Sequence, residues 1–135
     1  MRGGGSSFLQ ACLLLLIGER PDHGYALLER LEPFGLADGD PPQMYRTLRA
    51  LERSGCVGSR WVPSDCGPAR RIYYLTAEGH ATLAECAVAL RRKRDQTTHY
   101  LRRHEALAQI CPELAPNGRA GRSPAAIRLN EEPVR

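Results

Sequence analysis

The stretch that decides the fold is residues 40–57, which read DPPQMYRTLRALERSGCV. Asp40 can cap a helix N-terminus, and proline is well tolerated at the first helical position after it. Met44, Leu48 and Leu51 fall at i, i+4 and i+7, so they form one apolar stripe. The Ser-Gly pair near the end of the stretch can close a helix, because glycine adopts the left-handed conformation easily. This pattern predicts a short helix that is buried along one side.

The other side of this helix is polar and basic, with Gln43, Tyr45, Arg46, Arg49 and Arg53 mostly off the apolar stripe. A short helix that is buried on one side and presents Gln, Tyr and Arg on the other suits insertion into the DNA major groove. The alternative is a surface helix that happens to be rich in arginine. This segment alone does not distinguish the two interpretations.

The residues that precede this segment predict two more helices. We expect one over residues 8–17 and another over residues 24–31, with Asp22 as its cap and Tyr25 on its inner side. Residues 33–40 are then a loop between packed helices. A helix, a turn and a basic helix form a helix-turn-helix. Residues 1–7 are flexible by composition.

Beyond position 55 the pattern changes from helical to alternating. Residues 57–62 and 70–75 read as two strands, and turn-forming residues lie between them. A β-hairpin directly after a recognition helix is a wing, and Arg70 and Arg71 at its base are placed to neutralise phosphates. The alternative is an ordinary edge hairpin with solvated arginines. The order of three helices and a hairpin favours the wing.

The last predicted element is a long helix over residues 77–110, capped by Thr76. Its inner positions alternate in steps of four and three, with Arg94 and Thr97 interrupting the apolar ones; they are Leu83, Ala87, Leu90, Arg94, Thr97 and Leu101. We expect this stripe to form a homodimer; the alternative is that the helix folds back on the first helix of its own chain. Residues 111–135 look disordered, with four prolines and scattered charge.

The charge distribution of the chain also favours binding to a polyanion. The net charge is +4 over 135 residues, and residues 41–75 carry six arginines against two acidic residues, as a polyanion-binding surface requires.

The longest apolar run, residues 11–17, is too short to span a bilayer. We expect a cytoplasmic protein that is not associated with a membrane. Five cysteines without a C-x-x-C pair and four histidines without ligand spacing predict no metal and no disulfide framework. We find no arrangement typical of an enzyme, and expect no cofactor.

Three motifs resemble the PadR family of transcriptional regulators: LLLLIGERPDHGY at residues 13–25, YRTLRALERSG at residues 45–55 and GPARRIYYLTAEG at residues 67–79. The resemblance covers about residues 8–105. It implies a mainly α fold with a small β-hairpin, that is, a winged helix-turn-helix domain (residues 8–76) and a C-terminal dimerisation helix (residues 77–110). It also implies a dimeric repressor that binds a palindromic operator in double-stranded DNA and that a small aromatic effector releases.

The candidate DNA-binding residues are Gln43, Tyr45, Arg46, Arg49, Arg70 and Arg71. Among them, we expect Arg49 to contact a base and Arg46 a phosphate or a base; many members of the family have proline where this chain has Arg46. Alternatively, both arginines pair with Glu52 or Glu32, and Tyr45 packs its ring against the second helix.

Trp61, the single tryptophan, either covers the inner face of the wing or lines an effector pocket near the first and last helices. Thiol-based sensing through Cys56 or Cys66 stays open. The competing hypothesis for the whole chain is a winged-helix protein-interaction module without specific DNA binding, with the acidic first third as its partner surface.

Overall fold

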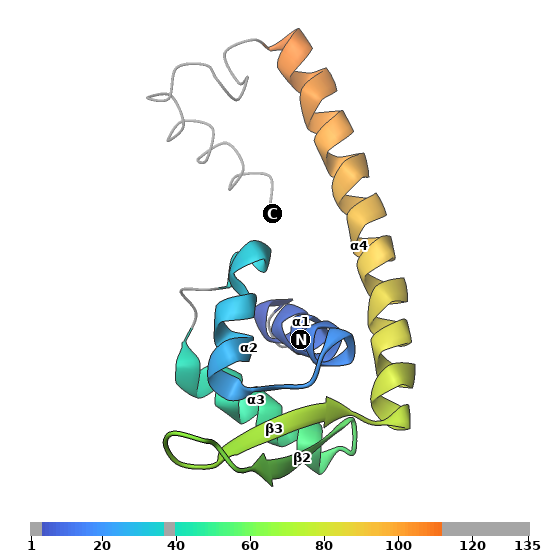
Figure 1. The fold of residues 1–135 in the computed structure, drawn as a ribbon. Helices are drawn as coiled ribbons and strands as arrows, with labels where there is room; N and C mark the ends of the chain where they lie inside the picture. The colour runs from blue at the N-terminus through green and yellow to red at the C-terminus, as the bar shows by residue number, and fades with distance from the viewer. Residues whose placement is uncertain (1–3, 37–39, 112–135) are drawn as a thin grey trace. The chain divides into compact units, whose positions relative to one another are not determined.

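The computed structural model describes residues 4–36 and 40–111 (Figure 1). The elements, in chain order, are α1 (Gly4–Glu19), β1 (Asp22–His23), α2 (Gly24–Arg30), the 3-10 turn η1 (Glu32–Phe34), α3 (Pro41–Arg53), β2 (Val57–Val62), β3 (Arg70–Leu75) and α4 (Ala77–Ile110). The chain divides into two compact units, residues 1–89 and 90–135. The predicted fold class is confirmed: the molecule is mostly helical, with a small antiparallel sheet in a winged-helix arrangement and a long C-terminal helix.

The sheet has three strands in the order β1-β3-β2, all antiparallel. The predicted hairpin is present at its predicted residues, and its register pairs Val57 with Leu75 and Trp61 with Arg71. The third strand, β1, has two residues, and Asp22 pairs there with Tyr73. Because two residues carry no alternating pattern, sequence periodicity gives no sign of this strand. It ties the turn before α2 to the wing (Figure 1).

The core of the first unit is built around α1, which is buried on nearly all sides. Leu9, Leu13, Leu16 and Ile17 are buried, and Leu14 is fully buried as well. The apolar stripe of α3 is confirmed, and packs in the same cluster; its buried residues are Met44, Leu48 and Leu51. Burying α1 and the α3 stripe fixes which side of α3 remains exposed.

Several predicted helix ends differ from the observed ones. The first helix begins at Gly4 rather than Phe8, so residues 4–7, predicted to be flexible, are helical; residues 1–3 lie outside the described residues. The predicted loop over residues 33–40 contains part of η1. Asp40 has the extended backbone of an N-cap but makes no side-chain capping bond. The predicted tail lies outside the described residues except for Cys111.

The cap of α2 is His23 rather than the predicted Asp22: its Nδ1 accepts the backbone N–H of Ala26 at 3.4 Å. The carboxylate of Asp22 instead binds Arg20 and Arg30. Tyr25, which we expected on the inner side of α2, is 63% exposed, and the buried position is taken by Leu27. In a helix of two turns, a small error in phase moves a side chain from core to surface.

The start of α4 is anchored to the turn that follows α3. As predicted, Thr76 is the cap, and its hydroxyl oxygen accepts the N–H of Gly79 at 3.0 Å. The same hydroxyl lies 2.6 Å from the carbonyl oxygen of Gly55 and 2.9 Å from that of Cys56, and can donate its hydrogen to either. Gly55 has φ +87°, the left-handed conformation expected after a helix.

The described part of the second unit is the remainder of α4, from Leu90 to Ile110, and Cys111. Large apolar side chains are exposed along it: Leu90, Tyr100, Leu101, Leu107 and Ile110. Within the described residues, no helix is long and apolar enough to cross a membrane.

Candidate nucleic-acid interface

One open cleft of the first unit brings together residues from β1, α2, α3 and the wing. It is lined by His23, Gly24, Tyr25, Tyr45, Trp61, Arg70, Arg71 and Tyr73. No acidic side chain lines it among the described residues. Three of the predicted DNA-binding residues, Tyr45, Arg70 and Arg71, are therefore neighbours although the chain separates them.

Tyr45 reaches the cleft because Gly24 leaves room for its ring. A Cβ at position 24 would lie 2.5 Å from the Cε1 atom of Tyr45 and 2.7 Å from its hydroxyl oxygen. The ring therefore packs directly on the start of α2, which agrees with one of the two predicted roles of Tyr45. The contact also places the hydroxyl at the start of α2, in the cleft that Arg70 and Arg71 line as well.

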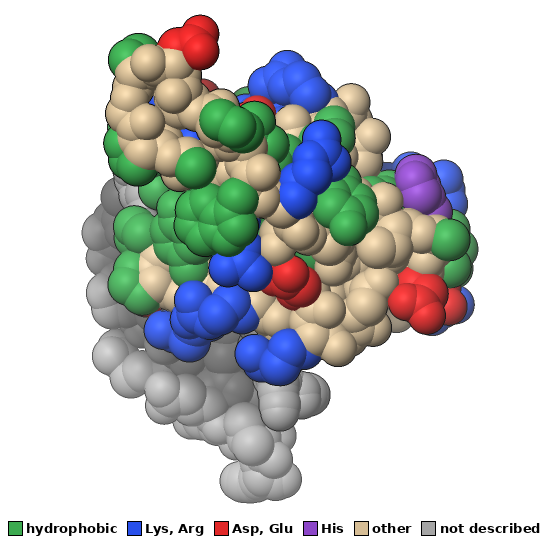
Figure 2. All heavy atoms as spheres, turned by 60° about the horizontal axis from the view of Figure 1, so that its bottom comes forward, with side chains coloured by type: hydrophobic (Ala, Val, Ile, Leu, Met, Phe, Trp, Pro, Cys, Tyr) green, Lys and Arg blue, Asp and Glu red, His purple; other side chains and the backbone are tan. Residues whose placement is uncertain are grey.

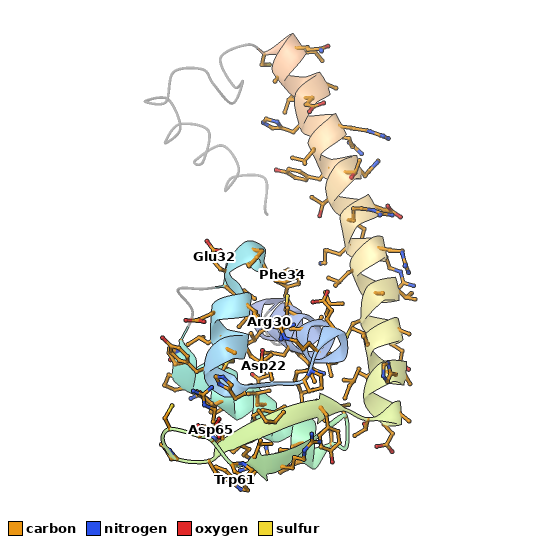
Figure 3. The ribbon with its side chains drawn as sticks, in the orientation of Figure 1. Asp22, Arg30, Glu32, Phe34, Trp61 and Asp65 are labelled. Atoms are coloured by element: carbon orange, nitrogen blue, oxygen red, sulfur yellow. The ribbon has the colours of Figure 1, made fainter. Side chains whose placement is uncertain are left out.

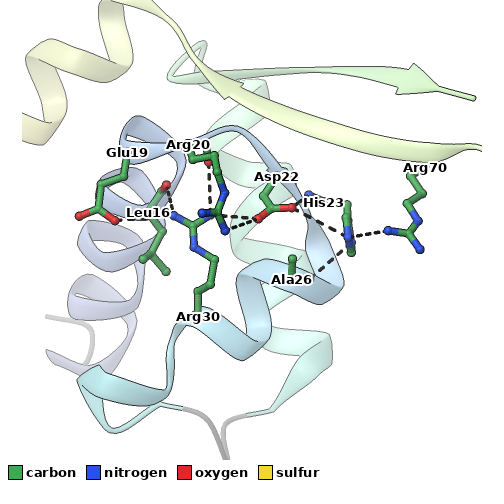
Figure 4. A network of polar contacts seen from close by, with 8 residues as sticks. All are labelled: Leu16, Glu19, Arg20, Asp22, His23, Ala26, Arg30 and Arg70. Carbon is green, nitrogen blue, oxygen red and sulfur yellow. Dashed lines mark hydrogen bonds and ion pairs between the residues drawn. The ribbon is translucent and has the colours of Figure 1, made fainter. Parts of the chain in front are cut away.

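Arg70 and Arg71 point to opposite faces of β3, because consecutive residues in a strand alternate. Arg70 turns towards β1, where its Nη1 lies 3.0 Å from Nε2 of His23 (Figure 4). His23 therefore contacts two donors, Arg70 and the N–H of Ala26. Since a neutral imidazole accepts at one nitrogen only, these two contacts compete for the ring.

A network centred on Asp22 holds β1 in place (Figure 4). Its carboxylate accepts bonds from Arg30 Nη1 at 3.1 Å, Arg20 Nη2 at 3.2 Å and the N–H of His23 at 3.0 Å. Arg30 also donates to the carbonyl oxygen of Leu16 at 2.8 Å, so the network joins α1, β1 and α2. Burial raises the pKa of Asp22, but these bonds and the nearby positive charges outweigh it, and the pKa is lowered overall.

Arg71 turns towards α3 and is bound there by an acidic residue. Its Nη2 lies 3.2 Å from Oε1 of Glu52, and its Nε donates to the hydroxyl of Ser59 at 2.9 Å. The guanidinium carbon is 5.8 Å from the ring centre of Trp61 and 6.0 Å from that of Tyr73. The predicted phosphate ligand of the wing is thus already held by a carboxylate, which the sequence pattern did not indicate.

Arg46 and Arg49 lie on the exposed side of α3. Within residues 4–36 and 40–111, neither forms an ion pair, and Glu52, proposed above as their alternative partner, is bound to Arg71 instead. Gln43 lies on the other flank of α3, where it is half-buried beside Leu28 and Leu36. The structure therefore groups the basic candidates on one side of α3 and places Gln43 apart from the cleft.

Trp61 is 66% exposed and lies on the wing (Figure 3). By strand alternation it shares the face of the sheet that carries Ser59, the face turned towards Glu52 of α3. Among the described residues, none from α1 or α4 lines the cleft that contains Trp61. Trp61 therefore does not lie in a pocket near the first and last helices, where we expected it.

Seen from the wing side, Lys and Arg side chains are interspersed with hydrophobic ones across the surface (Figure 2). Tyr25 and His23 are among the cleft residues that were not predicted to bind DNA. The motif HGY at residues 23–25 contains both, but its periodicity assigned Tyr25 to the core. The sequence signal that could have identified Tyr25 is a tyrosine directly after a glycine at the start of a predicted helix.

The cysteines in the described part of the chain are free thiols. Cys56 is buried and its Sγ lies 3.4 Å from the hydroxyl oxygen of Thr82, whereas Cys66 is exposed in the wing loop. Burial raises the pKa of Cys12 to about 11 and also raises that of Cys86. None of the described residues form a group of three or more potential metal ligands.

Comparisons with known proteins agree with this geometry. A family model described as "Transcriptional regulator PadR-like family" matches residues 13–85. Among solved structures, a conserved protein of unknown function described as a potential transcriptional factor is similar at 32% identity. The similarity covers 81% of this chain and 97% of that one, with a TM-score of 0.68.

Two further solved structures are similar. A PadR family transcriptional regulator from Eggerthella lenta has 26% identity and a TM-score of 0.56, covering 66% of this chain and 80% of that one. A PadR-like transcriptional regulator from Bacillus cereus has 22% identity and a TM-score of 0.62, covering 69% and 90%, and supports the fold alone. Among curated proteins, none matches the chain.

Proposed function

Because the chain belongs to the PadR-like family of transcriptional regulators, we propose that it is a dimeric repressor that binds a palindromic operator and that a small aromatic effector releases. DNA-binding regulation follows from the family. The dimer, the direction of regulation, the operator and the effector are the proposal.

The cleft between α2, α3 and the wing is the observation that carries this proposal. It combines two arginines, a histidine and hydroxyl donors of tyrosines, and no acidic side chain lines it among the described residues. Groups of this kind bind the sugar-phosphate backbone, which fixes a protein's orientation on the duplex. Arg46 and Arg49 on the exposed side of α3 then face the major groove, where arginine binds guanine bidentately. In this arrangement Tyr25, Tyr45 and Arg70 contact phosphates, and Arg49 reads a base.

The experiment that tests DNA recognition is enrichment of genomic fragments by the purified protein at moderate and high salt. We expect one recurrent palindrome, with half-sites about one helical turn apart. Substituting Arg49 with alanine should remove the sequence preference, at a cost of roughly 1–3 kcal/mol. Specific binding that survives this change would show that another residue reads the bases. No enrichment at either salt concentration would favour the protein-interaction module instead.

The exposed apolar side chains of α4 support the homodimer. Tyr100, Leu101, Leu107 and Ile110 are 48–76% exposed, and apolar residues in such numbers on one long helix are typical of an association surface. A twofold dimer also matches the symmetry of a palindromic operator. Sedimentation of the purified protein should give twice the mass of the chain.

For the effector, Trp61 is the candidate reporter because it is the single tryptophan and its ring is exposed at the cleft. An aromatic effector must bind the DNA-competent and DNA-incompetent forms with different affinity in order to shift their populations. Quenching of the Trp61 fluorescence by a panel of aromatic compounds, together with release of operator DNA by the same compounds, would support this role. Release without any change in the fluorescence would place the effector elsewhere.

A further inference from the structure

Glu52 is the only acidic residue in α3, β2 and β3. It lies in the last turn of α3, where one carboxylate oxygen accepts the hydroxyl of Ser59 at 2.7 Å. Arg71 Nη2 lies 3.2 Å and 3.4 Å from the two carboxylate oxygens. With a side chain that is 30% exposed, Glu52 is at the edge of the proposed DNA-binding surface rather than in the core.

The three side chains form a closed ring, because Arg71 Nε also donates to the hydroxyl oxygen of Ser59 at 2.9 Å. The ring takes one residue each from α3, β2 and β3. Among the described residues, Glu52 and Arg71 form the ion pair that connects the recognition helix to the wing. The two proposed DNA-binding elements are therefore held together by side chains at this point.

This ring has an electrostatic consequence for DNA binding. A phosphate that binds Arg71 must displace the carboxylate of Glu52 or share the guanidinium with it, and the displaced carboxylate then repels the phosphate. Arg70 differs, since its partner is a ring nitrogen of His23 and not a carboxylate. Of the two wing arginines, Arg71 is thus the one whose charge is already compensated in the free protein.

The inference rests on the proposed DNA-binding function. We infer that Glu52 is a specificity-determining residue: it occupies Arg71 and so lowers the affinity for DNA of arbitrary sequence, while the ring positions the wing against α3 for the operator. Binding to arbitrary sequences depends almost entirely on phosphate neutralisation. Operator binding depends in addition on base contacts that require α3 and the wing to be correctly placed. Specificity is the difference between the free energies of binding to the operator and to arbitrary sequences. Glu52 weakens binding to arbitrary sequences and positions the wing for the operator, so it increases this difference.

The variant Glu52→Gln tests this inference, because glutamine keeps an acceptor oxygen for Ser59 but removes the charge. Affinity for a short duplex of scrambled sequence is measured over a range of salt concentrations. For each protomer in contact with the duplex, we expect the slope of log K against log salt to become steeper by about 0.9, the value for one additional neutralised phosphate. The ratio of operator affinity to scrambled-duplex affinity should fall. The control is Glu32→Gln, which removes the same charge in η1, at the opposite end of the unit from Trp61 (Figure 3), and should leave the slope unchanged.

The variant Arg71→Gln shows whether the effect passes through Arg71. In that background, Glu52→Gln should no longer change the slope; the same steepening there would overturn the inference. If Glu52→Gln does not fold in a thermal unfolding control, Ser59→Ala serves instead, since it keeps both charges and opens the ring. It should steepen the slope by less than one phosphate, and an unchanged slope counts against the inference.

The two levels of failure are distinguishable. A wild-type protein that binds neither duplex refutes the proposed function. A wild-type protein that binds its operator, together with a Glu52→Gln variant of unchanged slope and unchanged specificity ratio, refutes the role of Glu52 alone.

Discussion

The contact between Gly24 and Tyr45 predicts that the substitution Gly24→Ala lowers DNA affinity without a comparable loss of stability. An added Cβ would lie 2.5 Å from the Cε1 atom of Tyr45. Non-bonded carbon atoms favour separations of about 3.5–4.0 Å, so the ring must retreat by about 1 Å. That displacement moves the hydroxyl of Tyr45 from its position in the cleft that Arg70 and Arg71 also line.

The effect on stability is small because the ring is the outer end of a rotatable, half-buried side chain. Alanine also restricts the unfolded chain more than glycine does, which contributes about 0.4–1 kcal/mol in the opposite direction. The effect on binding is larger, since a hydrogen bond to a charged phosphate contributes roughly 1.5–3 kcal/mol. We therefore expect operator binding to weaken about ten- to a hundredfold for each half-site.

The assay is fluorescence anisotropy with a labelled operator, run on wild type, Gly24→Ala, Tyr45→Phe and the double variant, with urea unfolding of each. If the glycine acts by placing the tyrosine hydroxyl, the double variant binds no more weakly than the weaker single variant. Additive losses would refute this reasoning. So would wild-type affinity in Gly24→Ala when Tyr45→Phe binds weakly.

Three further predictions concern the core, the dimer and the response to pH. Leu48→Ala should lower the free energy of unfolding by about 2–5 kcal/mol in urea, because Leu48 is fully buried. Leu101→Lys should shift the sedimenting species from dimer to monomer and weaken operator binding, whereas Glu105→Gln on the same helix should do neither. Burial raises the pKa of Cys12 from 9.0 in the ordinary thiol to about 11, so its contribution to stability is full below pH 9.0 and is lost as the pH rises towards 11. Urea unfolding of Cys12→Ala over this range should show a smaller decline than wild type, with the remainder due in part to Tyr73 and Cys86, whose pKa values burial also raises.

The parts of the fold that the sequence predicts are those with strong local signals. The apolar stripe of α3 repeats over about two turns, and a glycine with positive φ follows the helix, so both its buried side and its end could be predicted. The two wing strands are six-residue runs that contain β-branched and aromatic residues, and turn-forming residues separate them. In each of these segments, one local pattern decides the structure.

The parts that could not be predicted depend on contacts between distant segments. Glu52 and Arg71 are 19 residues apart, and nothing in the sequence selects Arg71 over the nearer arginines as the partner of Glu52. Likewise, Asp22 has the residue type of a helix cap, but Arg20 and Arg30 bind its carboxylate and leave the capping role to His23. The candidate residues could be named from the sequence, whereas their ionic partners required the structure.

The anchoring of α4 by Thr76 links the stability of two elements. Its hydroxyl lies within hydrogen-bonding distance of the carbonyl oxygens of Gly55 and Cys56, in the turn after α3, and accepts the N–H of Gly79 in the first turn of α4. A Cβ at Gly79 would overlap the Cys56 carbonyl. Unwinding the start of α4 therefore removes bonding partners from the end of the recognition helix. In the proposed homodimer, a partner subunit that binds α4 favours the folded state by mass action, so diluting the protein should increase amide hydrogen exchange at the end of α3.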